Sequence, residues 1–492
     1  MKIKALKWAL IVIGSVTFLT LLWKGPWWLD GSHLSPQLTP GTGAVVTGFR
    51  TTVVAIGAGA VAAIGLYYTD RNFRHTQQLF DHAREKDREQ AEMTREGQMT
   101  DRYATAVDLL SSENELKRMG GVYALERVMR DSPKDSSTTL DVLAAFVRKN
   151  AKIIHPNEDE ADETPNLPDD VNAALTVIGR RKKHAADLAV DLRRCDLKHA
   201  DLSDFNLRGV RFDGAILQKA NLRGADLRGA QLSGADLYQA QLDTADLSGG
   251  SLRGARIELA SFELSQLRGT DLRRANARRA RLGRANLEEA NLEGAKFTSC
   301  QMLGVSMKGV RASETDFRGA YISDADLAGA DLRKARFDGS HMEKSNFSEA
   351  RLANAQLCDS ELRGADFGES DLQAANLTRA DLRKCNFNKA HLTFAQLTEA
   401  NLAGAVVHNA YLIQVNFSKA DLREADFSGS TLHSAHMKEA KMEGVNFCGA
   451  SLPSITGATI EMVLTAKMNR ETYLDDEFKN VDEIKVLLEG GN

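Results

Sequence analysis

Histidine and cysteine are the residue types in this chain that could bind a metal or act as nucleophiles. His433 and His436 stand three residues apart, but neither a cysteine nor a carboxylate lies at ligand spacing from them. We interpret them as an incidental surface pair. The five cysteines are far apart and contain no CxxC motif, which predicts neither a zinc site nor a disulfide framework. They are Cys195, Cys300, Cys358, Cys385 and Cys448.

No motif for catalysis or cofactor binding occurs in the sequence. GxxxxGK[ST], GxSxG and HExxH are all missing. Gly57 and Gly59 lie inside an apolar run, where a phosphate-binding loop cannot operate. We therefore predict that the protein is not an enzyme, that it uses no cofactor, and that it has no catalytic, cofactor-binding or metal-binding residues.

A cluster of arginines is the one surface feature that suggests binding. Seven arginines fall within 17 residues, and Asp271 is the only acid among them. We call them the arginine collar: Arg268, Arg273, Arg274, Arg278, Arg279, Arg281 and Arg284. The collar suits a polyanion, an acidic lipid or an acidic protein surface. Alternatively, its arginines pair with Asp and Glu in neighbouring parts of a repeat.

The elements that position these residues follow from composition. The chain has 492 residues, of which 43% are hydrophobic and 26% charged, and it has only eight prolines, so it is not mainly disordered. The formal net charge is −4, and residues 191–450 carry 35 basic and 35 acidic residues. Bulk charge therefore predicts neither a nucleic-acid binder nor an acidic mimic of nucleic acid.

Two apolar runs near the N-terminus predict membrane spans. All four tryptophans flank the first run, Ala9 to Leu22, as an aromatic belt does, and no signal-peptide cleavage site follows it. The second run, Thr51 to Tyr68, has 18 residues, enough for about 27 Å of helix. Gly59 and Ala63 form a small-xxx-small pair that fits packing within the hairpin and dimerisation equally well.

Positive charge predicts the orientation of these spans. Three lysines precede the first span and two arginines follow the second, whereas Arg50 is the one basic residue at the outer mouth of the second span. By the positive-inside rule both ends face the cytoplasm. We therefore predict a two-span hairpin over residues 1–70, in the bacterial inner membrane.

The segment between the spans and the repeat has a helical pattern. Residues 71–150 predict a solvated helical stalk and then a helical module, with a break at Asp131-Ser132-Pro133; a coiled-coil seam is too sparse to be favoured. Residues 151–189 predict an acidic linker, 157–170, followed by a short helix that caps the next domain.

From residue 190 to 454 the chain repeats every five residues without an insertion. Of the 53 unit centres, 51 are Leu, Phe, Met, Ile or Val, and the exceptions are Ala277 and Ala312. A small residue, usually alanine, stands two positions before each centre. A period of five matches neither a helix nor a strand, so each unit must be a short extended piece plus a corner, stacked in coils.

The A(D/N)LxG pattern resembles the pentapeptide-repeat family, as in Ala220-Asn221-Leu222-Arg223-Gly224. This resemblance implies a mainly β fold, a right-handed quadrilateral β-helix with four units per coil. The flanking pieces GGVYALERVMRDSP and DVNAALTVIGRR are similar to the membrane-anchored bacterial branch of the family, whose members mostly have no known function.

Twenty residues per coil make the core testable. Phe297, Phe317 and Phe337 should stack on one side of the coil, and the set that begins with Phe347 and Phe367 on the opposite side. Around Ala312, larger residues at small positions compensate for the lost volume, whereas Ala277 lacks compensation. Three cysteines occupy small inward positions and should be buried: Cys195, Cys300 and Cys385.

Residues 455–492 leave the five-residue period and predict two capping helices. The first, near Ile460, should cover the open end of the rod. The second, over 481–488, should pack on the rod or on a second copy of the chain.

A membrane-tethered scaffold is the function that these features favour. Its rigid cytoplasmic rod would bind a cytoplasmic protein, while both chain termini lie in the cytoplasm and two spans contact the bilayer. A homodimer is an open alternative, and nucleic acid is not an expected partner. A DNA mimic that protects a topoisomerase and a membrane-disrupting effector regulated by the rod are the other candidate functions.

Overall fold

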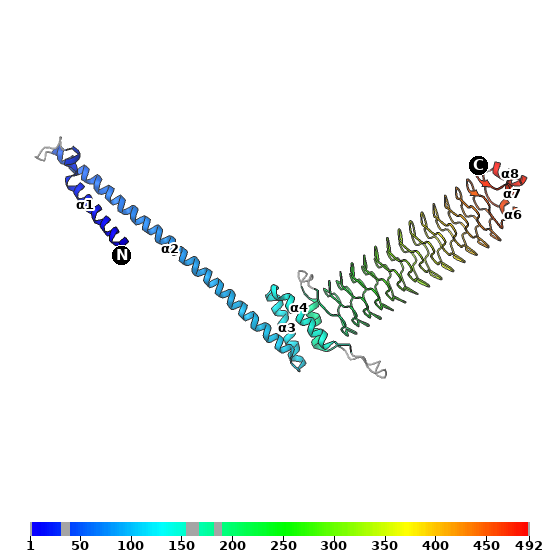
Figure 1. Ribbon diagram of the computed structural model, residues 1–492, viewed down its shortest axis with the longest axis horizontal. Helices are drawn as coiled ribbons and strands as arrows, with labels where there is room; N and C mark the ends of the chain where they lie inside the picture. Colours follow the sequence, from blue (N-terminus) through cyan, green and yellow to red (C-terminus); the bar gives the residue numbers. More distant parts are fainter. Residues whose placement is uncertain (1, 31–39, 154–166, 182–188, 491–492) are drawn as a thin grey trace. The chain divides into compact units, whose positions relative to one another are not determined.

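A computed structural model describes residues 2–30, 40–153, 167–181 and 189–490 (Figure 1). By its contacts the chain separates into two compact units, Met1–Gln98 and Met99–Asn492. The first holds two long apolar helices; the second holds a β-helix with short helices at each end. The loop between the predicted spans and most of the predicted acidic linker, 157–166, lie outside the described residues.

Helix α1 (Lys2–Asp30) packs against the first part of helix α2 (Pro40–Leu110) through glycines. The Phe18 ring covers Gly57, and the Phe49 ring covers Gly25, so that neither glycine has room for a side chain. Space around Gly59 is open. The hairpin therefore uses Gly57, and the predicted small-xxx-small pair stays exposed on α2.

Pro26 explains the one polar contact between these helices. A proline inside a helix has no N–H to donate to the carbonyl four residues earlier, which here belongs to Leu22. Arg50 of α2 donates its Nε–H to that carbonyl at 3.1 Å. The arginine at the mouth of the second predicted span thus satisfies an acceptor that the proline leaves free.

The helical module of the second unit contains three helices and one more break than predicted. Helix α3 (Glu115–Asp131), the single turn η1 (Pro133–Asp135) and helix α4 (Ser136–Asn150) place a break where Pro133 is expected to cause it. A further turn separates α2 from α3, because the Asn114 side chain accepts a hydrogen bond from the Lys117 N–H and caps α3. The sequence pattern suggests an unbroken helix there.

Helix α5 (Asp169–Gly179) packs between α3 and α4 and closes the first coil of the rod. Asp170 is fully buried in an ion pair with Arg118 of α3. At the far end of α5, the Gly179 carbonyl accepts from Asn206 N at 2.9 Å, and the Ala151 carbonyl accepts from Asp196 N at 2.8 Å. These bonds satisfy backbone groups that an open coil would leave in water.

Each five-residue unit of the rod makes the same bonds. In the unit that starts at Ala225, Asp226 forms a parallel bridge with Asp246, and the Leu227 side chain points inward. Arg228 and Gly229 form the corner, with Gly229 at φ +66°. Every such bridge joins residues 20 apart, so four units make one coil and the coils stack as parallel strands.

The core of the rod alternates large and small side chains as predicted. Phe317 and Phe337 stack at 4.9 Å, and Phe347 and Phe367 also stack at 4.9 Å. Phe337 meets Phe347 edge-on at 6.3 Å, which places the two sets on opposite sides of the coil. The predicted phenylalanine stacks are confirmed.

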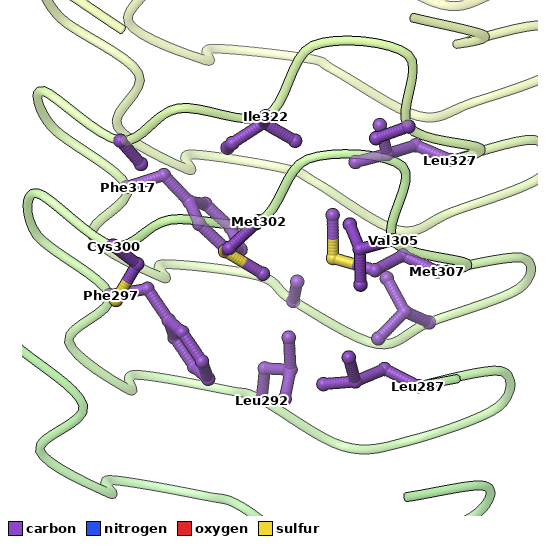
Figure 2. Close-up of a cluster of buried hydrophobic side chains, with 14 of the residues drawn as sticks. Leu287, Leu292, Phe297, Cys300, Met302, Val305, Met307, Phe317, Ile322 and Leu327 are labelled. Atoms are coloured by element: carbon purple, nitrogen blue, oxygen red, sulfur yellow. The ribbon is translucent and has the colours of Figure 1, made fainter. Parts of the chain in front are cut away.

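Figure 2 shows how the core fills the space around its small centres, with Cys300 and Val305 beside the phenylalanines. Ala312 and its enlarged neighbours are all buried. Ala277 was expected to lack compensation, but Cys300 Sγ lies 2.8 Å from its carbonyl oxygen. Cys300 therefore contributes volume near both alanines.

The C-terminal segment closes the other end with backbone pairs as well as helices. Strand β1 (Ser451–Leu452) pairs with strand β2 (Tyr473–Leu474), and helix α6 (Ile460–Leu464) buries Val463. Helices α7 (Asp476–Lys479) and α8 (Asp482–Gly490) follow, and α8 contacts both α6 and α7 and buries Ile484. The second helical segment therefore packs on the tail of its own chain.

Candidate interaction surface

Outward side chains of the rod lie in columns. We define a column as the residues 20 apart, which lie above one another on successive coils because the bridges pair them. Three positions of each unit face outward: the bridge residue and the two corner residues. A column neighbour is therefore as close in space as a residue two positions away in sequence.

Most arginines of the rod are neutralised within their own unit. In each Asp-Leu-Arg or Asp-Phe-Arg triplet the arginine at the first corner position pairs with the aspartate at the bridge position, at 2.5–2.8 Å. The hydrogen bond from Arg193 lowers the pKa of Asp191 to about 2. These triplets start at Asp191, Asp226, Asp271, Asp316, Asp331, Asp381 and Asp421.

The arginine collar departs from this rule. Arg273 pairs with Asp271 at 2.7 Å, and Arg268 pairs with Glu289 at 2.9 Å. The other five are exposed, because none of them follows an aspartate by two residues. Within the part of the chain that the structure describes, no ion pair joins these five to a carboxylate; they are Arg274, Arg278, Arg279, Arg281 and Arg284.

Arg278 nevertheless has an acidic neighbour in its own column. Arg256 donates a hydrogen bond to Glu258, which lowers the pKa of that carboxyl, and the charge of Arg278 lowers it further. Arg274 and Arg278 face different sides of the rod from the remaining three. The collar thus separates into two paired arginines, one partly compensated arginine and four without a charge partner among the described residues.

Large apolar side chains surround three of the unpaired arginines, a feature that the sequence analysis missed. Leu259, Leu264, Leu303 and Tyr321 are 40–55% exposed. They stand at outward positions of the repeat, which was the signal available in the sequence. We call the whole group the arginine-leucine face: Leu259, Leu264, Arg279, Arg281, Arg284, Leu303 and Tyr321.

Two shallow grooves cross this face. The first, of about 510 Å³, is lined by Leu259, Arg279, Arg281 and their column neighbours. The second, of about 320 Å³, is lined by Leu303, Tyr321 and residues beside them. Gln301 borders both grooves. They are depressions in a solvent-exposed surface, and their lining carries positive charge, amide groups and apolar carbon.

The cysteines and histidines singled out in the sequence do not come together. Cys195, Cys300 and Cys385 are buried, and burial raises the pKa of each thiol to about 12, which leaves them protonated and unreactive. His433 and His436 lie on different sides of the coil, since they belong to successive units. The His436 ring contacts Thr456 Oγ1 at 2.6 Å.

Three other residues do come together through the columns. His341 Nδ1 lies 2.9 Å from a carboxylate oxygen of Glu361, and Glu343 lies beside them, with all three potential ligand atoms within 4.8 Å. The Tyr321 ring stacks on His341 at 4.5 Å. An exposed ion-pair network has the same composition, so this triad supports no functional assignment. The 20-residue register could have identified it.

The sequence profile described as pentapeptide repeats matches this chain in eight copies. The matched residues are 191–229, 225–263, 265–302, 300–339, 313–349, 350–388, 390–429 and 416–453. A comparison with curated proteins found no match.

Solved structures similar to this chain are themselves pentapeptide-repeat proteins or a resistance protein. HetL, involved in heterocyst differentiation regulation in the cyanobacterium Nostoc sp. strain PCC 7120, is 24% identical over 52% of this chain and 88% of HetL, with a TM-score of 0.18. QnrB1, a plasmid-mediated fluoroquinolone resistance protein, is 18% identical over 40% of this chain and 93% of its own, with a TM-score of 0.29. Rfr23 from Cyanothece 51142 is 34% identical over 19% of this chain and 60% of its own, with a TM-score of 0.15.

Proposed function

Because the chain belongs to the pentapeptide-repeat family, we propose that it is a non-catalytic scaffold, tethered to a membrane, whose rod presents side chains to a protein partner. The observation that carries the proposal is the contrast on the surface of the rod. Arginines elsewhere on it pair with an aspartate of their own unit, whereas four collar arginines are exposed without such a partner. Exposed, unneutralised arginine is enriched at protein interfaces.

The buried chemistry of the rod supports a non-catalytic role. The most nucleophilic groups in the coil core are thiols whose raised pKa values keep them protonated. The grooves on the rod are open depressions rather than enclosed pockets. We also expect the rod to wind in the right-handed, four-sided manner of its family.

Tethering to the membrane rests on helices α1 and α2. Both are long and apolar enough to cross a bilayer, and the apolar stretches are exposed within their unit. Lysines before the first span and Arg71 and Arg74 after the second favour a cytoplasmic location for both termini and the rod. This arrangement matches the membrane-anchored bacterial branch of the family, in the inner membrane.

Two other functions are less well supported. A DNA mimic that protects a topoisomerase needs an acidic rod, whereas residues 191–450 have no net charge. A membrane-disrupting effector is compatible with the hairpin and would raise the permeability of cells that overexpress the full chain. An unchanged permeability to a small dye under these conditions would favour the scaffold.

Cysteine accessibility tests the tethered arrangement. In a full-length protein with Cys358 and Cys448 replaced by serine, Ser35→Cys should react with an impermeant maleimide in intact cells. Glu349→Cys, exposed on the rod, should react only after the cells are permeabilised. The reverse pattern would place the rod outside. Proximity labelling with and without residues 190–454 then asks whether the rod recruits a protein, and identical labelled sets would contradict the scaffold.

A further inference from the structure

We propose that the arginine-leucine face binds an acidic, amphipathic segment of a partner protein, in which carboxylates alternate with large apolar side chains. This inference rests on the proposed scaffold function and deepens it. It assigns the contact to one side of the rod, and it specifies the chemistry of the partner.

The charge of the face is complementary to carboxylates. Arg279, Arg281 and Arg284 lie on the same coil, and all three are exposed. Their column neighbours on the coils before and after are uncharged: Leu259 and Ser299, Ser261 and Gln301, and Leu264 and Gly304. The rod itself therefore offers these arginines no acid in the direction where its other ion pairs between coils form.

One carboxylate lies among them. The Glu263 side chain extends over Gly283, the one residue of this coil side that has no side chain. Three positive charges against one negative charge leave the face basic, while the rod as a whole is neutral. A ligand with several carboxylates is attracted to this place and not to the rod in general.

The apolar residues distinguish a protein segment from other anions. Seven large apolar side chains are exposed among the described residues of the rod, and four belong to this face: Leu259, Leu264, Leu303 and Tyr321. The other three, Phe394, Val406 and Tyr411, lie on coils nearer the C-terminus. Leucine side chains contribute nothing to the binding of a phosphate group, but they bury area against apolar side chains of a peptide.

The arrangement of the two kinds of residue fits an amphipathic segment. The row of arginines lies between a coil with two exposed leucines and a coil with one, and successive coils are about 4.8 Å apart. The apolar rows therefore stand about 10 Å apart, on both sides of the basic row. The grooves beside Arg279 and Leu303 open onto this strip. Carboxylates over the arginines would place neighbouring apolar side chains over the leucines and Tyr321.

A membrane surface and a nucleic acid fit less well. Both present many phosphates over a long distance, and the next coil carries Glu288, Glu289 and Glu293 on the adjoining sides of the rod. Those acids would repel an extended anionic surface, whereas a short segment can stay within the face. A second copy of the chain is the remaining alternative occupant.

Site-specific photocrosslinking of the full chain in the cells that express it tests this proposal. A benzoylphenylalanine at Leu303 should form a covalent product with a protein, and the crosslinked peptide, identified by mass spectrometry, should be rich in Glu, Asp and large apolar residues. The same probe at Phe394, which is 47% exposed elsewhere on the rod, should not capture that peptide. Crosslinks to lipid, to nucleic acid, to another copy of this chain or to a basic or neutral peptide would overturn the proposal.

Charge variants add the second readout. Reversing Arg279, Arg281 and Arg284 to glutamate together should reduce the crosslinked product by at least about tenfold, and lysine at the same positions should restore part of it. Arg274→Glu, an exposed collar arginine on another side, should leave the product unchanged. Equal yields from the reversed and the original face would overturn the proposal, provided that circular dichroism shows the rod folded. Capture at Phe394 alone would move the binding surface and keep the scaffold, whereas no capture at either position contradicts both.

Discussion

Phe367 allows the packing of the rod to be tested quantitatively. Its side chain is fully buried and stacks on Phe347 at 4.9 Å and on Phe387 at 5.0 Å. Removing a buried phenylalanine ring costs about 3–5 kcal/mol, and each stacked pair contributes about 0.5–1.5 kcal/mol beyond area burial. Backbone bonds hold the coils above and below, so the cavity left by alanine cannot collapse. We expect Phe367→Ala to cost about 5 kcal/mol.

The same residue type on the surface gives the control. Phe394 is 47% exposed at a corner position, so Phe394→Ala should change stability by less than about 0.5 kcal/mol. Phe367→Leu keeps the inward residue that most units use, and it should cost less than about 1.5 kcal/mol.

Native-state hydrogen exchange measures these effects locally, which suits a repeat protein whose coils contact only their neighbours. In Phe367→Ala, protection of amides in residues 347–387 should fall by about three to four powers of ten, and coils far from the substitution should change little. Equal losses in Phe367→Ala and Phe394→Ala would refute the argument. A cost below about 1 kcal/mol for Phe367→Ala would refute it as well.

Burial and ion pairing give three further predictions. In the native protein a thiol reagent should modify at most the half-buried Cys358 and Cys448, and all five cysteines after unfolding; a third fast thiol would contradict the burial. Alanine in place of the arginine that follows Asp191 by two residues should raise the pKa of that carboxyl from about 2 toward its ordinary value near 4, measured by NMR titration. Because the folded-state pKa is depressed, this pair stabilises the fold above about pH 4 and ceases to do so as the pH falls through 2, where variant and parent should unfold alike. Ile484→Ala should destabilise the C-terminal cap by about 2–5 kcal/mol, whereas Val486→Ala, 69% exposed two residues away, should not, as judged by thermal unfolding.

The five-residue period of the sequence is sufficient to determine the rod and its core. Because each unit returns the chain to the same inward direction, the period alone predicts which residues are buried, and burial of Phe317 and Cys300 follows from their numbers. The break at Pro133 is equally evident from the sequence, since proline cannot continue a helix. The turn before Asn114 is not, because a capping side chain competes with helix only in its local context.

The charge state of the collar was open in the sequence and decided by the tertiary structure. Composition shows seven arginines, but only the columns show that Arg268 reaches Glu289 and that Arg281 has Gln301 and Ser261 as neighbours. The same stacking brings Leu264, Arg284 and Leu303 onto one face, although they span 40 residues of sequence. Contacts between coils depend on the 20-residue repeat of the backbone, whereas the local pattern repeats every five residues. A surface assembled across coils therefore appears only when the coil closes.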